Sequence, residues 1–466
     1  MEKFQNVTDF SLKSVLIAPL GETDGYEIKQ MVNTFSYVES ITSPFLAATM
    51  TVADSAGLLQ DLPIQGGETV KVTVQTSSKE EPEEYVLQVW KVGNRYAKNN
   101  TQAFTIGLIS VEGLNNECVR LMKKLEGHPE EIIAKILTED LKTTKSFVTT
   151  LNGMSSPTQF SVKMLPTNRR PFDIISSLSV KSVSKDTNGS AGSSSNSQSN
   201  RGKIGGSAGY FFWENKRGFN FFAVDSLLEK NDDNTWGPYI EKPANQSDGS
   251  DDRITISQAT FTSEVDIMSA MRKGKYSSLI VFFNHSTGQY EEYDYSLQDA
   301  YTDMKHLGAQ NTPSLIKFSD KSISDYPTRI VSKILDHESW YNDPEIASYD
   351  EQDGSESPSE FCDFHNHFSA QSMMRYELLK HQVATIVIPG NSEICAGDKI
   401  NIKLVNKTPG ARVQDEPYDP ESSGIYLIQE VTHTYNSTQS TNGRFVTTLR
   451  LMRDSYGDIE SNHGTK

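Results

Sequence analysis

One short cluster in the sequence carries residue types that bind metal ions. The segment 362–367 reads Cys362, Asp363, Phe364, His365, Asn366 and His367. A His-x-His spacing can place two imidazoles on one face of a strand, and a thiolate suits zinc. No second pair of ligands stands nearby at the spacing of a zinc finger. The same histidines also suit a surface or helix-capping role, so we assign no metal, no cofactor and no catalytic residue.

Other motifs for catalysis are missing from the sequence. Walker A and H-E-x-x-H patterns do not occur, and the G-x-S-x-G spacing is met only at 205–209, at the end of the Ser-rich stretch. The glycines of 202–206 lack the strand-then-helix frame of a phosphate loop. The sequence therefore predicts a protein that is not an enzyme. The alternative is a metal-dependent hydrolase that uses the 362–367 cluster, and metal analysis of the purified protein separates the two.

Charge and composition narrow the class of protein further. The 466 residues carry 44 Lys and Arg against 61 Asp and Glu, a net charge of −17. Such a chain is poorly suited to wrapping nucleic acid, because phosphate binding needs clustered cations. No apolar run approaches the ~18 residues of a membrane span. The three cysteines, none in a C-x-x-C, favour a reducing compartment and buried thiols.

Strand patterns dominate the first part of the chain. Thr69–Gln75 alternates strictly between apolar and polar residues, which is typical of a half-buried strand. Tyr85–Val92 and Phe104–Val111 are rich in β-branched and aromatic residues, and turn signals separate them. We expect residues 1–115 to form a first antiparallel β-barrel domain.

A mixed α+β domain is expected over residues 116–252. Pro129 and Pro171 each begin an apolar stripe at helical spacing. Tyr210–Trp213 and Phe219–Val224 flank a turn and predict a hairpin. The Ser-rich stretch 184–209 has too little apolar surface to offset its ordering entropy, so we expect a flexible loop there.

The remainder is expected to form a second β-barrel domain with an insert. Strand patterns over 253–299 and 380–457 predict the second barrel. Residues 300–379 predict an inserted acidic α+β or loop domain, in which 342–363 holds eight acidic residues and no Lys or Arg. A disordered tail is expected over 458–466.

The C-terminal strands repeat the pattern of the N-terminal ones. The segment that begins at Gly67 and Glu68 matches the one that begins at Gly397 and Asp398, and both continue with apolar residues at every second position. Further pairs share one offset of 341 residues: Tyr85 with Tyr426, Gln88 with Gln429, Phe104 with Phe445, and Leu108 with Leu449. The repeat predicts two β-domains of one kind, with Val72 and Ile402 at equivalent inward positions. Phe104 and Phe445 are likewise expected to be buried, each in the core of its own domain. Three such chains would present six similar domains in a ring.

Several stretches, taken in order, resemble the central baseplate hub subunits of contractile-tailed bacteriophages of the T-even type. They are Phe35–Ile41, Met50–Asp54, Leu62–Glu68, Phe211–Leu228, Ser423–Ile428, His433 and Leu449–Gly457. The hub part of type VI secretion spike proteins is related in fold. The likeness is weakest over 184–209 and 300–370.

The resemblance implies a fold and a set of partners. The fold is mainly β, with two similar antiparallel, tail-tube-like β-barrels and two smaller α+β domains in each chain. Three chains form a pseudo-sixfold ring that joins the sixfold tail tube to the threefold central spike.

The implied partners are further copies of the chain, the trimeric spike, the tail tube or a tube-initiator protein, and tape measure and baseplate wedge proteins. DNA passes through the lumen without specific binding, and an acidic lumen would repel it. The implied location is the virion tail baseplate, after assembly in the host cytoplasm. A carbohydrate-binding protein on the tail periphery is a weaker alternative, because such a binder has little need for two like barrels.

Overall fold

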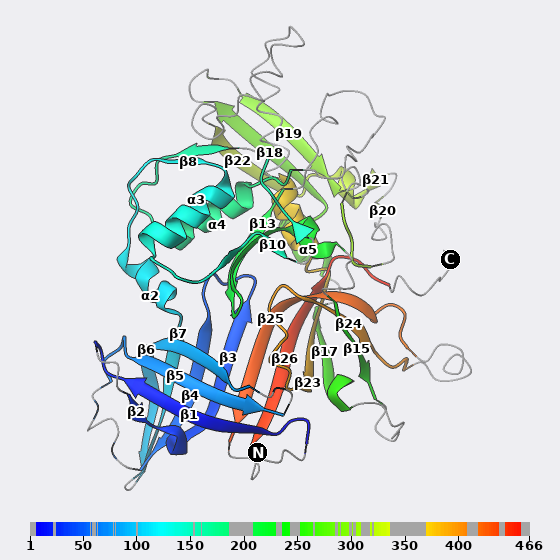
Figure 1. Ribbon diagram of the computed structural model, residues 1–466. Coiled ribbons are helices and arrows are strands. Elements are labelled where there is room, and N and C mark those ends of the chain that lie inside the picture. The colour runs from blue at the N-terminus through cyan, green and yellow to red at the C-terminus, as the bar shows by residue number, and fades with distance from the viewer. Residues whose placement is uncertain are drawn as a thin grey trace.

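The computed structural model of the chain places a large β-sheet in the lower half of Figure 1 and smaller α+β parts above it. The described residues are 6–21, 25–55, 57, 62, 64–77, 79, 81–98, 101–151, 154–159, 161–185, 208–229, 235–242, 252–263, 266–284, 288, 290–297, 301, 304–308, 317–318, 321–335, 370–407, 418–437 and 443–457. The predictions for 342–363, for the metal-ligand cluster 362–367 and for the tail 458–466 lie outside them. The same holds for all but the two ends of the Ser-rich stretch.

The large sheet has fourteen strands, which come from both ends of the chain. The first module, as we name it, consists of β1 (Phe10–Ala18), β2 (Tyr26–Glu27), β3 (Val32–Ser40), β4 (Ala47–Asp54), β5 (Thr69–Thr76), β6 (Glu83–Lys98) and β7 (Thr101–Ile109). The second module consists of β15 (Thr235–Glu241), β16 (Thr255–Ile256), β17 (Gln258–Ser263), β23 (Gln382–Pro389), β24 (Lys399–Lys403), β25 (Gly424–Asn436) and β26 (Arg444–Arg453).

The two modules have the same strand order. The first runs β3-β4-β7-β6-β5-β1-β2, and the second runs β17-β23-β26-β25-β24-β15-β16. Two pairings differ in direction, because β1 is antiparallel to β5 and β2 while β15 is parallel to β24 and β16. The repeat predicted from the sequence is therefore present as a repeat of topology.

Neither module closes into a barrel by strand pairing, so that part of the prediction is wrong. Within the described residues β1 pairs with β2 and β5 but not with β3. In the second module the two edges of the sheet are linked only by a bent segment of the chain, residues 255–263. Its first part, β16, pairs with β15 at one edge, and its second part, β17, pairs with β23 at the other. The sheets instead merge, because β25 also pairs with β3 of the first module over Glu430–Asn436.

The register of the repeat differs in part from the predicted one. Val72 pairs with Tyr85, and Ile402 pairs with Gly424 at the matching place on β24 and β25. Val72 and Ile402 are thus equivalent, and both are buried, as predicted.

For the pairs predicted from the common offset of 341 residues, the structurally equivalent residue lies two positions away from the predicted one. Val89 pairs with Leu108 where Ile428 pairs with Leu451, so Leu108 corresponds to Leu451 and not to Leu449. By the same count Phe104 corresponds to Thr447 and not to Phe445. The faces were still predicted correctly, since a shift of two residues keeps a side chain on the same face of a strand.

Two hydrophobic cores lie against the large sheet. The first-module core includes Phe10, Phe35 and Phe104, and it also takes in Tyr435 and Phe445 from the last two strands of the chain. The second core contains Ile402 and most of the buried apolar residues of β25 and β26, among them Leu449. Phe445 therefore completes the core of the other module, which corrects the expectation that it packs in its own.

The α+β domain stands above the junction of the two modules in Figure 1. Its helices are α2 (Val111–Cys118), α3 (Pro129–Lys135) with the π-helical turn η2 (Ile136–Asp140), α4 (Pro171–Lys181) and α5 (Val224–Leu228). Its strands are β8 (Leu125–Gly127), β9 (Phe147–Val148), β10 (Thr150–Leu151), β11 (Met154–Ser155), β12 (Val162–Met164), β13 (Tyr210–Asn215) and β14 (Gly218–Ala223). Both predicted proline-initiated helices and the predicted hairpin are present, with Pro129 and Pro171 in the first helical turn.

The insert contains a separate three-stranded sheet. Its elements are α6 (Ile267–Arg272), β18 (Ser277–Asn284), β19 (Tyr290–Ser296), β20 (Lys317–Phe318), β21 (Lys321–Ser322), β22 (Arg329–Leu335) and a helix over 370–378. Short 3-10 turns are η1 (Lys29–Met31), η5 (Asp252–Ile254) and η7 (Ile323–Asp325).

Two expected domain boundaries change as a result. The hairpin of β18 and β19 was expected in the second barrel, but β18 pairs with β22 in the insert. Conversely, β15 was expected in the α+β domain, yet it joins the second module. The strand pattern of β15 is not evident from the sequence, because Gly237 and Pro238 interrupt it.

Two further findings concern the cysteines and the possibility of a membrane-spanning helix. Cys118 is exposed while Cys395 is buried, so the expectation of buried thiols is wrong for Cys118. None of the helices in the described part of the chain has the length and apolar character that a membrane crossing would need.

Candidate functional site

Polar side chains concentrate where separate segments of the chain meet. Among the described residues, no three His, Cys, Asp or Glu side chains are grouped so that they could hold a metal ion. The buried polar groups instead join the modules, the α+β domain and the insert at two places. We call these the hairpin junction and the arginine junction.

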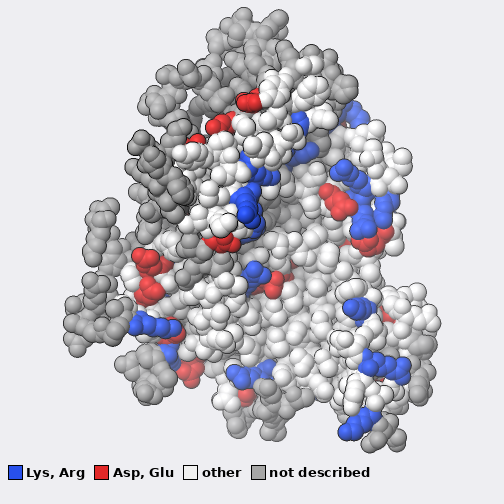
Figure 2. All heavy atoms as spheres, turned by 180° about the vertical axis from the view of Figure 1, so that it is seen from behind, with Lys and Arg blue, Asp and Glu red and all other residues white. Residues whose placement is uncertain are grey.

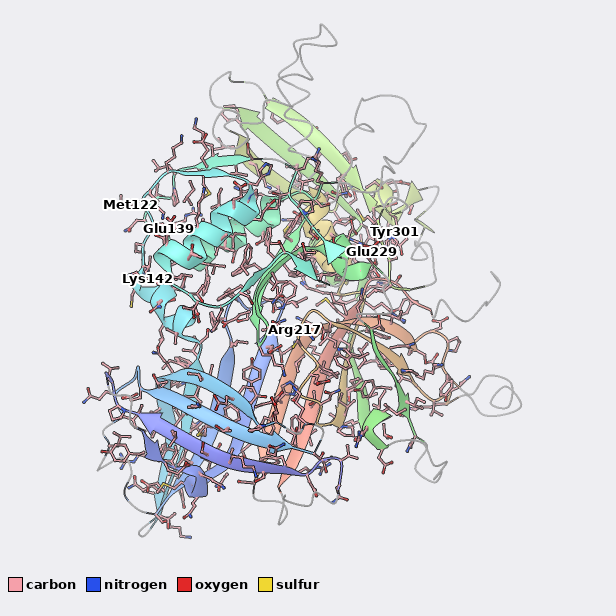
Figure 3. The ribbon with its side chains drawn as sticks, viewed as in Figure 1. Met122, Glu139, Lys142, Arg217, Glu229 and Tyr301 are labelled. Atoms are coloured by element: carbon pink, nitrogen blue, oxygen red, sulfur yellow. The ribbon has the colours of Figure 1, made fainter. Side chains whose placement is uncertain are left out.

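The hairpin junction forms around the turn between β13 and β14. Arg217 in this turn donates to both carboxylate oxygens of Asp398, over 2.7 and 2.9 Å. Trp236 on β15 donates its Nε1–H to the same carboxylate at 3.0 Å. Figure 3 shows Arg217 at the tip of the hairpin, where it reaches the large sheet. A bidentate pair fixes direction as well as distance, so it orients the hairpin on the second module.

Glu39 on β3 joins the first module to the same junction. Its carboxylate accepts hydrogen bonds from the backbone N–H of Lys216 at 2.8 Å and of Ala396 at 3.0 Å. The Tyr37 hydroxyl donates to it at 2.9 Å. Glu39 therefore holds the hairpin and the loop before β24 with one side chain.

Burial makes Glu39 hard to ionise. The side chain is 1% exposed, and this desolvation raises its pKa to about 7, although the backbone hydrogen bonds from Ala396 and Lys216 oppose the rise. The positive charges of Lys216 and Arg217 also act on it.

The raised pKa of Glu39 predicts an unusual pH dependence of stability. A folded-state pKa above the ordinary value of 4.5 means that the folded protein binds the proton more tightly than the unfolded chain. The contribution of Glu39 to stability is therefore greatest below pH 4.5 and falls as the pH rises through about 7. We expect Glu39→Gln to be more favourable, relative to the wild type, at pH 8 than at pH 5.

Unfolding temperatures of both proteins at the two pH values measure this difference. Glu84→Gln is a suitable control, because Glu84 is exposed in an ion pair with Lys71. An equal effect of Glu39→Gln at both pH values would contradict the prediction.

His433 lies beside this junction and is uncharged. Its ring stacks on that of Tyr37 with 6.2 Å between centroids, and its Nδ1 lies 3.0 Å from Thr447 Oγ1. Burial lowers the pKa of His433 to about 3. The residue therefore acts as a packed aromatic ring between β3 and β26.

The arginine junction joins the insert to the end of the chain. Arg375 is fully buried and pairs with Asp454, over 3.4 Å, and with Asp225 on α5. Asp454 also accepts from the backbone N–H of Leu307 at 3.0 Å, and His306 Nδ1 lies 2.6 Å from it. Figure 3 labels Tyr301, whose ring stacks on His306 at 3.8 Å between centroids.

The charges at this junction compensate each other. Burial alone would raise the pKa of Asp454, but the hydrogen bond with His306 and the charge on Arg375 bring the pKa below its ordinary value. Asp454 is thus ionised, and the ion pair connects α5, the 370–378 helix and the segment after β26.

Arg453, the last residue of β26, extends the same junction to the large sheet. Its guanidinium lies 4.3 Å from the centroid of the Tyr426 ring and donates to Gln382 Oε1 at 3.1 Å and to Ser423 O at 2.8 Å. A cation over an aromatic face is stabilised further when water is excluded. Arg453 thereby ties together β23, the start of β25 and the end of β26.

Solved structures give this arrangement a context. The chain aligns with the tail protein from Neisseria meningitidis MC58 over 96% of its length and 97% of that chain, with a TM-score of 0.50 and 8% identity. It aligns equally with the 43 kDa tail protein of prophage MuSo2 from Shewanella oneidensis, at a TM-score of 0.50 and 8% identity, over 95% of this chain and 99% of that one. The chain has the fold of phage tail proteins.

A further alignment concerns the E. coli c3393 protein, a component of the type VI secretion system that exhibits structural similarity to the T4 tail proteins gp27 and gp5. It covers 96% of this chain and 78% of that one, with 10% identity and a TM-score of 0.41. No protein-family profile matches the sequence, and no curated protein is similar to it in sequence. The resemblance inferred from the sequence is confirmed at the level of the fold.

Within the tail-protein fold, the stretches that carried the resemblance have structural roles. Phe35–Ile41 contains Glu39, Ser423–Ile428 contains Tyr426, and Leu449–Gly457 contains Arg453 and Asp454. Sequence reasoning did not single out Glu39, Asp398 or Arg375 as junction residues. The one local signal is a charged residue within an otherwise apolar strand or helix, since such residues are rarely buried unless they are paired.

Proposed function

We propose that this chain is a structural subunit of a phage tail baseplate, the hub that connects the sixfold tail tube to the threefold central spike. The observation that carries the proposal is the pair of modules with one strand order, fused into one sheet by β25 and β3. Three chains would supply six similar modules, which matches sixfold symmetry on one face and threefold symmetry on the other.

The polar junctions support a structural role. The polar side chains of Glu39, Arg217 and Arg375 each form hydrogen bonds with backbone or side-chain groups of other segments. Groups used in this way hold segments in place, and the resulting rigid body suits an adaptor that transmits position between two partners.

The partners follow from the proposed role. They are two further copies of this chain, the trimeric central spike, the tail tube or its initiator, and tape measure and baseplate wedge proteins. DNA would cross the lumen of the ring without specific binding, and the net charge of −17 favours its passage. We place the protein in the virion tail.

The mass of the assembled protein tests the proposal. Sedimentation equilibrium is expected to give a species of three 52.0 kDa chains, alone or with the mass of a bound cognate spike added. The reason is that only three copies bring six modules together. A stable monomer in the presence of the spike would overturn the proposal.

A further inference from the structure

The outer half of β6 lacks a neighbour on one side. β5 pairs with β6 only as far as Gln88, while β7 pairs with it to Lys98. We call Trp90–Lys98 the β6 arm. In the described part of the chain its other edge is open, and its aromatic residues are exposed, Trp90 by 55% and Tyr96 by 64%. Such an edge is a template for pairing with another strand.

β25 is the equivalent strand of the second module, and its outer half is covered. Both strands carry a bulge at the matching place, between Val89 and Lys91 in β6 and between Ile428 and Glu430 in β25. Beyond the bulge, β25 pairs antiparallel with β3 over Glu430–Asn436. The position left open on the β6 arm is therefore the one that β3 occupies on β25.

The second module has its own equivalent of β3, and that strand is open too. Ser36 of β3 pairs with Thr49, and Thr260 of β17 pairs with Thr385 at the matching place on β23. Within the described residues β17 pairs with β23 alone, and Thr260 is exposed. In Figure 1 β6 and β17 lie towards opposite sides of the large sheet.

We propose that the β6 arm of one chain pairs antiparallel with β17 of a second copy, as β25 pairs with β3 within each chain. The inference rests on the proposed homotrimer and names its contact surface. Each module would then pair with the next one through equivalent strands, alternately within one chain and between two chains. Three chains joined in this way would close the ring.

Charge favours this pairing. Residues 85–111 contain Lys91, Arg95 and Lys98 and no Asp or Glu. The sequence around β17, residues 248–266, contains five acidic residues and a single basic one, Arg253. Figure 2 shows Lys and Arg side chains at its lower right, the side on which β6 lies after the half-turn between the views. The β6 arm is therefore a cationic segment of an otherwise acidic protein, which suits it to an acidic neighbour.

The pairing of β25 with β3 within one chain fixes the register expected for the pairing of the β6 arm with β17 between chains. On β25, Thr434 pairs with Ser36, and their hydroxyl oxygens are 3.4 Å apart. Tyr96 is the equivalent of Thr434, because their partners Ala103 and Val446 each lie five residues before the equivalent residues Leu108 and Leu451. Tyr96 of one copy should therefore face Thr260 of the next.

Disulfide trapping in the full-length chain tests this register. The background carries Cys118→Ser and Cys362→Ser, since Cys395 is buried. Tyr96→Cys with Thr260→Cys is expected to give reducible dimers and trimers on mild oxidation, because directly opposed Cβ atoms lie close to disulfide distance. Ser36→Cys with Thr434→Cys is the matched positive control and should link within one chain.

A second pair of cysteines is the control for cross-linking by random collision between chains. Lys71→Cys with Thr260→Cys places one cysteine on β5, within the first module and away from the arm. This pair should remain monomeric on the same gel, and equal cross-linking of it would overturn the inference.

The two proposals fail differently. If the wild type sediments as a trimer and the internal pair links, but Tyr96→Cys with Thr260→Cys does not, the pairing is wrong and the hub proposal stands. If the wild type stays monomeric with the spike present, both are overturned.

Discussion

Replacing Arg375 with alanine is expected to lower the stability of the insert by about 3–5 kcal/mol, the usual cost of removing one partner from a buried ion pair. Arg375 is, with Arg453, among the largest fully buried side chains of the described residues, and it bonds Asp454, Asp225 and the carbonyl of Lys305. Its removal leaves Asp454 without its cation and leaves a cavity between the insert and the second module. Both effects act in the same direction.

Hydrogen exchange followed by mass spectrometry locates this loss, because the chain has several parts that need not unfold together. Protection should fall first over 301–308 and 370–381, while β1 to β7 keep theirs. Arg450→Ala is the matched control, since Arg450 is exposed on β26 and should change stability by less than about 0.5 kcal/mol. Comparable losses in the two variants would show that the ion pair does not hold the insert.

Replacing Phe445 with alanine is expected to cost about 3–5 kcal/mol in the first module, although Phe445 lies on a strand of the second. The side chain is 1% exposed and stacks on Tyr435 with 4.3 Å between ring centroids. It also packs directly against Gly390, where a Cβ atom would meet its ring. Its truncation should therefore loosen β1 and β3, more than 400 residues earlier in the chain.

A second substitution on the same strand provides the comparison. Leu449, four residues further along β26, belongs to the second core and is 0% exposed. Leu449→Ala should cost about 2–5 kcal/mol and release protection in β23 and β24 instead. The opposite assignment, with Phe445→Ala loosening β23 and β24, would show that the first core does not depend on the C-terminal strands. Lys71→Ala should affect neither core, because Lys71 forms an exposed ion pair with Glu84.

Much of the fold could be predicted because alternation reports which face of a strand is buried. Thr69–Thr76 alternates in burial along its whole length, as its residue types indicate. The same information cannot fix register, since any shift by two residues keeps the faces. This is why Phe104 and Phe445 were both expected to be buried, correctly, and were paired with each other, wrongly.

The junctions could not be predicted, because their partners are remote in sequence. Glu39 is held by Lys216 and Ala396, and Arg217 by Asp398. Taken alone, each of these residues looks like an ordinary charged residue of the surface. Only the folded chain brings the donors close to the acceptors. β15 was missed for a local reason, since Pro238 interrupts its pattern.

The shared strand β25 also sets the order in which the molecule can be finished during synthesis. The first module emerges first from the ribosome, but its core lacks Tyr435 and Phe445, and the outer edge of β3 stays open until β25 arrives. Domains usually complete folding as they emerge. Here the N-terminal module is made first but is completed only when β25 and β26 have emerged. A chain whose synthesis stops early therefore never presents a finished first module to the growing assembly.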